Sequence, residues 1–174
     1  MAPNSKTKRW YAVYVRSRAE KKAADELLMN NIEHYLPLIK RLKQWSDRKK
    51  WVEEPLFRSY IFVRIDIKDY YHVLQNPYLV RYITFEGKAV PIPNEQIEAI
   101  RYFLEELEPD EPENIEWIKG QQVEVVAGEL TGLTGELIEV NGKHKVKVQI
   151  DAIGKSISIY IPKNKLQIIS QISE

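Results

Sequence analysis

The strongest concentration of chemistry in the sequence is a run of cations between Lys40 and Lys50. It holds six positive charges against one negative charge: Lys40, Arg41, Lys43, Arg48, Lys49 and Lys50 against Asp47. Trp45 and Trp51 lie within and beside this run, and cations next to aromatic rings are the mixture that contacts phosphates and exposed bases. The alternative is a solvated hairpin whose charges keep a strand edge from aggregating. The residues alone leave both interpretations open.

A second candidate surface is aromatic and comprises Trp10, Tyr11, Tyr14, Phe57, Tyr60 and Phe62. In a strand over 58–65, Tyr60 and Phe62 point to one face, and Ile61 and Val63 point to the other. The aliphatic face suits packing against helices, which leaves the aromatic face without an obvious cover. We therefore expect an exposed aromatic interface for a protein partner. The alternative is that these rings belong to the core.

Catalytic and metal chemistry find no support in the sequence. The chain has no cysteine, which excludes a disulfide scaffold, a thiol nucleophile and cysteine-ligated zinc. His34, His72 and His144 are far apart in sequence, and no nucleophile has a base beside it. We predict a protein that is not an enzyme, with no catalytic residue, no metal site and no cofactor.

The composition predicts a folded protein without a membrane-spanning segment. The 174 residues are 44% hydrophobic and 29% charged, enough to bury a core. No apolar run approaches the roughly 18 residues of a membrane span, and the N-terminus lacks the apolar stretch of a secretory signal. We expect a cytoplasmic protein.

Charge and residue type divide the chain in two. Residues 1–93 carry 18 Lys and Arg against 10 Asp and Glu, whereas residues 94–174 carry 8 against 15. Six of the seven glycines lie at or after Gly120. A stretch with two prolines and five acids separates the regions and is typical of a linker. We predict one domain over 6–106, a linker over 107–118 and a second domain over 119–172.

The first region reads as mixed α and β. Strands are expected over 10–16, 32–36, 58–65 and 80–85, a long hairpin over 38–52, and helices over 19–31, 68–75 and 94–107. Ser17 and Glu20 have the spacing of a capping box for the first helix. This order predicts an α+β fold in which helices pack on an antiparallel sheet.

The second region reads as five short strands, over 123–125, 137–140, 146–150, 157–161 and 165–169. Asn141-Gly142 is a strong hairpin turn. Gly128, Gly132 and Gly135 lack the Lys and Ser/Thr of a phosphate loop and instead fit a tight turn with positive φ. Such a small all-β region buries a core by curling into a five-stranded β-barrel.

These residues together resemble a known family. Lys8-Arg9-Trp10-Tyr11-Ala12-Val13 and Pro55-Leu56-Phe57-Arg58-Ser59-Tyr60-Ile61-Phe62-Val63 look like the N-terminal (NGN) domain of the NusG family of transcription elongation factors. Residues 120–140, with Gly128, Gly132 and Gly135, look like its SH3-like KOW barrel. Glu54-Pro55-Leu56-Phe57 and the segment 44–50 resemble the specialised RfaH and UpxY groups more than the housekeeping member.

The resemblance implies partners and sites. Tyr14, Phe57, Tyr60 and Phe62 would contact the clamp helices of the RNA polymerase β′ subunit. Arg16 and the hairpin cations Lys40, Arg41, Lys43, Arg48, Lys49 and Lys50 would approach upstream duplex or non-template DNA. The KOW domain would recruit a ribosomal protein or a termination factor, and the protein would act as a monomer. At the position where RfaH proteins carry a histidine–threonine motif that contacts the polymerase β gate loop, this chain has Tyr71-His72-Val73-Leu74. The chain departs from the motif here, so the resemblance leaves a gate-loop contact open.

The function so implied is antitermination, specialised for particular operons such as surface-polysaccharide loci. The alternatives are a housekeeping NusG elongation factor and an RNA-binding, ribosome-associated KOW protein. The latter should have a basic barrel, but residues 119–174 hold seven Lys and Arg against six Asp and Glu. The alternating pattern also favours β structure throughout this domain, rather than the helical form known for RfaH.

Overall fold

The computed structural model describes residues 8–106, 120–140 and 143–170. The chain divides into two compact units, residues 1–94 and 95–174. The predicted linker over 107–118 and the Asn141-Gly142 turn lie outside the described residues, so both stay predictions. Among the described residues, no helix is long and apolar enough to span a membrane.

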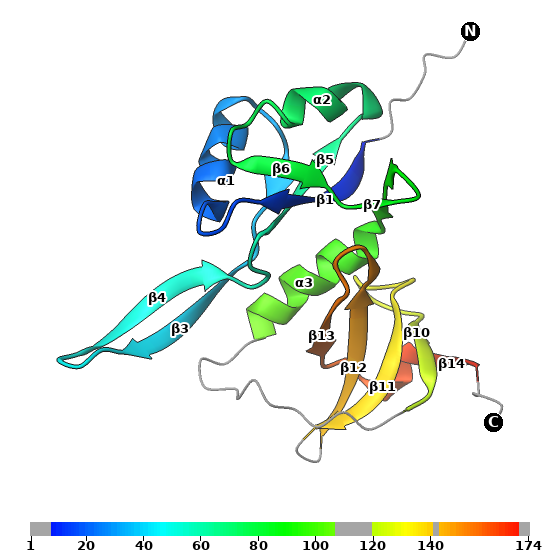
Figure 1. Ribbon diagram of the computed structural model, residues 1–174. Coiled ribbons are helices and arrows are strands. Elements are labelled where there is room, and N and C mark those ends of the chain that lie inside the picture. The colour runs from blue at the N-terminus through cyan, green and yellow to red at the C-terminus, as the bar shows by residue number, and fades with distance from the viewer. Residues whose placement is uncertain (1–7, 107–119, 141–142, 171–174) are drawn as a thin grey trace, which may run out of the picture. The chain divides into compact units, whose positions relative to one another are not determined.

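The first unit is built on an antiparallel sheet whose central strands are β1 (Arg9–Val15) and β5 (Tyr60–Ile65) (Figure 1). Strand order is β2-β5-β1-β6, with β2 at His34–Tyr35 and β6 at Leu79–Tyr82. A further short strand, β9 (Pro91–Ile92), also pairs with β1. β-branched and aromatic residues fill the two central strands, as strand propensity requires. The α+β prediction for this region is confirmed.

One face of this sheet packs against helices. Helix α1 (Glu20–Met29) and the short elements η1 (Ile67–Asp69) and α2 (Tyr70–Val73) belong to the first unit. The core that they share with the sheet comprises Tyr11, Val13, Val15, Ala19, Ala23, Leu27, Ile61, Val63, Ile65, Val73, Leu79 and Tyr82. The prediction that Ile61 and Val63 face the helices is therefore confirmed. Burial raises the pKa of the Tyr82 hydroxyl, which donates to the Tyr70 carbonyl at 3.0 Å.

The start of α1 differs from the predicted capping box. The N-cap is Ala19, which has no capping side chain, and Ser17 lies in the preceding turn. The Glu20 carboxylate is buried and accepts a hydrogen bond from the Ser59 backbone amide at 2.8 Å. The capping-box prediction is wrong because this carboxylate is engaged 39 residues away, by the loop that enters β5.

Two hairpins extend from the first unit. The predicted long hairpin is confirmed as β3 (Leu38–Gln44) and β4 (Lys49–Pro55), which pair only with each other (Figure 1). The strand predicted over 80–85 is instead divided, because β7 (Thr84–Phe85) turns back through Glu86-Gly87 to pair with β8 (Lys88–Ala89). Both turn residues have positive φ, as a tight two-residue hairpin turn requires.

The second unit contains a helix and a five-stranded antiparallel sheet. Helix α3 spans Asn94–Glu106, and the division of the chain assigns it from Glu95 onward to this unit. The strands are β10 (Gln122–Val125), β11 (Thr134–Val140), β12 (Lys143–Ile150), β13 (Lys155–Ile159) and β14 (Leu166–Ser170). Short turns η2 (Asp151–Ile153) and η3 (Lys163–Lys165) flank β13.

Strand order in this sheet is β13-β12-β11-β10-β14, with β13 and β14 at the edges of the described sheet. The prediction of five β-strands is confirmed, although hydrogen bonds do not close the described strands into a barrel. Gly128 and Gly132 have φ values of 91° and 94°, which explains two of the three clustered glycines. At Gly135, a Cβ atom would lie 2.4 Å from the Lys147 carbonyl oxygen, so only glycine allows β11 to approach β12 this closely.

Candidate functional site

The second face of the first sheet carries the predicted aromatic residues in rows. Across β1 and β5, Trp10 lies opposite Arg64, Ala12 opposite Phe62, and Tyr14 opposite Tyr60. Tyr35 on β2 lies opposite Phe62 from the other side, and the two rings stack with centroids 6.4 Å apart. The small side chain of Ala12 leaves room for the Phe62 ring. The sheet thus brings Trp10, Tyr14, Tyr60 and Phe62 together on one face, and Phe57 contacts Phe62 from the loop before β5. Tyr11, the sixth residue of the predicted set, instead lies on the face that packs against the helices.

Burial separates the six predicted residues: Trp10, Tyr11, Phe57 and Phe62 are buried, whereas Tyr14 and Tyr60 are more accessible. Phe62 has no exposed surface and Phe57 is only 6% exposed, and their rings meet edge to face at 6.3 Å. The expectation that these two rings form an exposed surface is wrong, and it is wrong for Trp10 and Tyr11 as well. Phe57 lies in the loop before β5, and the Phe62 ring contacts the rings of both Tyr35 and Phe57. The rings of Phe57 and Phe62 are both part of the buried core.

Tyr14 and Tyr60 form the accessible pair. Tyr14 is 37% exposed and Tyr60 is half-buried, and their rings meet edge to face at 5.9 Å. The Tyr60 amide donates to the Phe57 carbonyl at 3.3 Å, and Ser59 between them has a φ of 66°. A strained turn therefore sets the position of Tyr60, and the buried Glu20 carboxylate holds that turn through the Ser59 amide.

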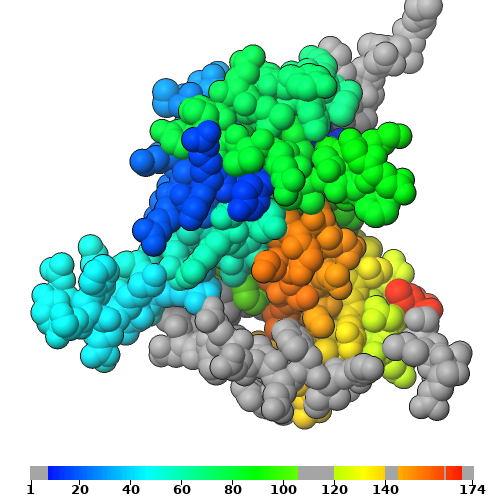
Figure 2. All heavy atoms as spheres, viewed as in Figure 1, coloured from blue at the N-terminus to red at the C-terminus, as the bar shows by residue number. Residues whose placement is uncertain are grey.

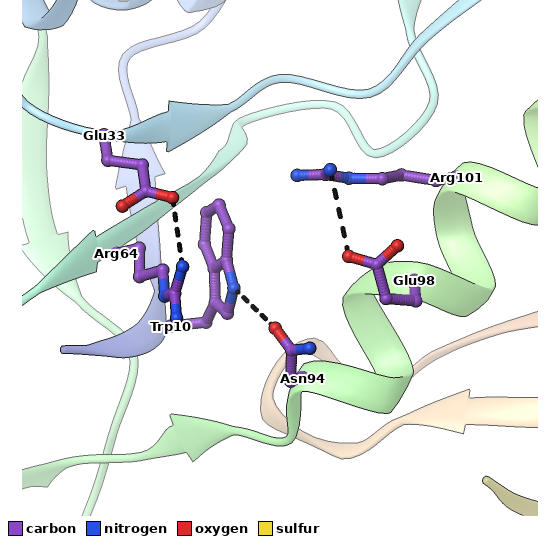
Figure 3. Close-up of polar contacts among 6 residues, drawn as sticks. All are labelled: Trp10, Glu33, Arg64, Asn94, Glu98 and Arg101. Atoms are coloured by element: carbon purple, nitrogen blue, oxygen red, sulfur yellow. Dashed lines mark hydrogen bonds and ion pairs between the residues drawn. The ribbon is translucent and has the colours of Figure 1, made fainter. Parts of the chain in front are cut away.

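Polar groups fix the opposite end of the same face. The Trp10 indole nitrogen donates to the Asn94 side-chain oxygen at 3.2 Å, and Arg64 forms an ion pair with Glu33 at 3.3 Å (Figure 3). Sequence reasoning missed both Glu20 and Asn94, because each acts on a residue far away in sequence and no local motif marks it.

Arg16 follows directly after β1 and is exposed. Its backbone amide donates to the Tyr78 carbonyl at 2.9 Å, which fixes the chain as it leaves the sheet. The guanidinium therefore projects from an anchored backbone, close in sequence to the accessible Tyr14.

The basic residues of the hairpin lie on an arm that projects from the first unit (Figure 2). Residues 42–50 are all exposed, and the Trp45 amide donates to the Arg48 carbonyl at 2.8 Å to close the turn. Glu54 forms ion pairs with Lys43 at 2.7 Å and with Arg41 at 3.2 Å. The hydrogen bond from Lys43, with the charges of Lys43 and Arg41, holds the pKa of Glu54 below its usual value.

A further group of cations lines a hollow beside the base of this arm. This hollow of about 810 Å³ is lined by cations from the start of α1, from the hairpin and from the loop before β5: Arg18, Lys21, Lys22, Lys43 and Arg58. Its acids are Glu20, Glu53 and Glu54, and Glu53 forms an ion pair with Lys21 at 3.8 Å. The hollow is therefore partly neutralised.

The described residues offer no cluster of metal ligands: they contain no group of three or more His, Asp and Glu side chains placed to hold a metal ion. His72, next to the exposed Tyr71 on α2, is itself exposed. The arrangement offers binding surfaces, aromatic on the sheet and cationic on the arm.

The family model described as "Transcription termination factor nusG" matches residues 8–101, which is more than half of the chain. The chain belongs to the NusG family. A solved structure titled "Domain interaction in Thermotoga maritima NusG" is 22% identical, with a TM-score of 0.50, covering 94% of this chain and 98% of that one. A chain from the MjSpt4:Spt5 complex is 21% identical with a TM-score of 0.32, covering 95% of this chain and 99% of the other.

Membership of the NusG family makes this protein a transcription factor rather than an enzyme. The matched residues include both the aromatic face and the hairpin of the first unit. These two surfaces are therefore the candidates for the contacts that such a factor makes.

Proposed function

We propose that this NusG-family protein is an antitermination factor that binds the clamp helices of the RNA polymerase β′ subunit through Tyr14 and Tyr60. The observation that carries the proposal is the accessible edge-to-face tyrosine pair on a family domain. Tyrosine is enriched in interface hot spots because its ring supplies apolar area and its hydroxyl supplies a hydrogen bond. Phe57 and Phe62 act in this proposal as the buried support of the pair.

The test is affinity for RNA polymerase, measured with purified Tyr14→Ala and Tyr60→Ala variants. Each should weaken binding by about 2 kcal/mol, roughly 30-fold, as loss of a hot spot does. The matched control is Phe85→Ala, because Phe85 is an exposed ring on the separate β7–β8 hairpin. Equal affinity in all three variants, with unchanged melting temperatures, would contradict the tyrosine interface.

The hairpin is proposed to contact nucleic acid beside the polymerase. Its support is a projecting arm with six cations, Lys40, Arg41, Lys43, Arg48, Lys49 and Lys50, while Arg16 is exposed at the end of β1. Upstream duplex and non-template DNA are the two candidate ligands. For contacts of this kind, the logarithm of the binding constant falls linearly with the logarithm of the salt concentration, with a slope of about 0.7–0.9 for each phosphate neutralised.

Reversing charge at Lys49 and Lys50 tests this second contact. Lys49→Glu with Lys50→Glu should reduce antitermination in a transcription assay and flatten the salt dependence of DNA binding. Polymerase affinity should stay near that of the unchanged protein, because both lysines lie on the arm and not on the tyrosine face. If the variant with both charges reversed kept full antitermination activity, the proposed nucleic-acid contact would be wrong, and the arm would be a solvated hairpin without a ligand.

The specialised role rests on resemblance to the RfaH and UpxY groups in the segments 44–50 and 54–62. A specialised factor should occupy one or a few operons, such as surface-polysaccharide loci, when its position is mapped along the genome. A housekeeping factor should follow every transcribed gene. The KOW-like domain predicted over 119–172 is proposed to recruit a ribosomal protein or a termination factor, since the seven Lys and Arg against six Asp and Glu of residues 119–174 disfavour direct RNA binding.

A further inference from the structure

The hairpin has two faces of different chemistry, which its pairing register defines. Lys40 lies opposite Glu53, Leu42 opposite Trp51, and Gln44 opposite Lys49. Directly opposed residues of an antiparallel pair project to the same side, and alternate residues along each strand do so too. These residues therefore form one surface, here called the tryptophan face. Ile39, Arg41, Lys43, Lys50, Val52 and Glu54 form the other surface, here called the glutamate face.

Charge on the glutamate face is partly neutralised. Glu54 lies within 2.7 Å of Lys43 and 3.2 Å of Arg41, so one carboxylate holds two of the three cations of this face. A phosphate approaching here has to compete with this carboxylate for the same nitrogen atoms. The glutamate face is therefore the weaker of the two for an anionic ligand, although it carries more basic residues.

The tryptophan face combines free cations with accessible apolar surface. Trp51 is 50% exposed and Leu42 is 44% exposed, and the two lie directly opposite each other. Lys40 and Lys49 lie on either side of the Leu42–Trp51 pair, and within the described residues neither forms an ion pair. Glu53, which lies opposite Lys40, instead forms an ion pair with Lys21. Trp45, 56% exposed, follows β3 at the tip of the arm. An exposed ring flanked by two cations is the combination that single-strand binding surfaces use, with the ring for a base and the cations for phosphates.

We infer that the tryptophan face binds single-stranded nucleic acid, with a base stacked on Trp51 and the flanking phosphates held by Lys40 and Lys49. A duplex offers phosphates but keeps its bases stacked inside, so the Trp51 ring would have no base face to contact. This inference rests on the proposed nucleic-acid contact of the hairpin and narrows its ligand to an unpaired strand. DNA and RNA share the chemistry, since every base has a π-face.

The experiment uses the full chain and fluorescently labelled oligothymidine and oligouridine of about 12 nucleotides, a length within known single-strand site sizes. A DNA duplex of the same length is the comparison. Anisotropy titrations at low and physiological salt should show tighter binding of the single strands than of the duplex. Tighter binding of oligothymidine than oligouridine would identify the DNA strand as the ligand, and the reverse order would identify RNA.

Three variants separate stacking from charge. Trp51→Leu keeps apolar bulk but removes the ring, and should weaken single-strand binding at least about fivefold while changing duplex binding little. Trp51→Phe keeps a ring and should retain most of the affinity, which excludes loss of hairpin structure as the cause. Phe85→Leu is the matched control, because it removes an exposed ring from the separate β7–β8 hairpin.

The outcomes distinguish this inference from the proposed function. Equal binding of duplex and single strand, or an unchanged affinity of Trp51→Leu, overturns the stacking inference. If charge reversal at Lys49 and Lys50 still reduces binding in that case, the nucleic-acid contact itself stands. Absence of measurable binding to all three oligonucleotides overturns the inference and the nucleic-acid contact together, and leaves the tryptophan face to a protein partner.

Discussion

The central pair β1–β5 and the arm β3–β4 are both antiparallel strand pairs with aromatic residues on one face, yet they bury those residues differently. In the central pair, Phe62 has no exposed surface and the opposite face packs against α1 and α2. In the arm, residues 42–50 are all exposed. The pair β3–β4 forms a two-stranded sheet of its own, whereas β1 and β5 lie inside a five-stranded one.

This difference in burial shows which structural features the alternation of residue types along a strand can predict. Alternation assigns residues to a common face in both pairs, because the period of a strand is two. It does not tell which face other parts of the chain will cover. In the first pair Trp10, Tyr11 and Phe62 are core and only Tyr14 and Tyr60 are accessible, whereas Trp51 of the second pair is exposed, although both patterns look alike in sequence.

The largest expected effect compares stability in the two pairs. Phe62→Ala should lower the free energy of unfolding by about 3–5 kcal/mol, because it removes a fully buried ring and leaves a cavity. Trp51→Ala should cost less than about 1 kcal/mol, since half of that ring is already exposed and it belongs to a surface strand pair. Chemical denaturation of the two variants, with Phe85→Ala as an exposed control, measures both values.

A comparable loss for Trp51→Ala would mean that the arm is an integral part of the fold rather than an independent extension. A small loss for Phe62→Ala would return this ring to the accessible surface expected from the sequence. Either result would remove the contrast between the central pair and the arm.

Most elements were predictable from the sequence because their signals are local. The strand over Arg58–Ile65, the helix after Ser17 and the long hairpin all follow from residue type and spacing, and the structure contains each of them. The division of 80–85 into β6 and β7 was missed, because the tight turn at Glu86-Gly87 redirects a segment that looks continuous.

The accessibility of the site was less predictable, because it depends on contacts between distant segments. The alternation around Tyr60 and Phe62 predicts that the two side chains share a face. It does not predict that Phe62 is buried in contact with the rings of Tyr35 and Phe57 while Tyr60 stays partly accessible. The role of Glu20 also escaped prediction. The spacing from Ser17 indicates a local cap, whereas the folded chain brings Ser59 within 2.8 Å of the carboxylate.

A medium effect tests this link between the buried core and the accessible tyrosine pair. Glu20→Ala should cost about 1–3 kcal/mol of folding free energy, because it leaves the half-buried Ser59 amide without its acceptor. Since Ser59 precedes Tyr60, the variant should also weaken polymerase binding. Glu20→Gln is the matched control: it retains an acceptor oxygen and should recover part of both losses. An Ala variant as stable as the unchanged protein would show that the turn before β5 holds its shape without this carboxylate.

The smallest effect lies on the glutamate face of the arm and has opposite signs in two measurements. The pKa of Glu54 is lowered in the folded chain, so its ion pairs stabilise the hairpin above the unfolded pKa of about 4.5 and lose that contribution as pH falls through the folded value. Glu54→Gln should therefore cost at most about 1 kcal/mol at neutral pH, as partly exposed pairs do, and progressively less as the pH falls through the lowered pKa of Glu54. The same change frees Lys43 from its ion pair with Glu54, so affinity for single-stranded oligonucleotide should rise while stability falls. Glu53→Gln is the matched control, because its contact with Lys21 is longer, at 3.8 Å, and more exposed. If Glu54→Gln lowered both stability and affinity, Glu54 would be shaping the arm for its ligand, and the claim that it competes with phosphate would fail.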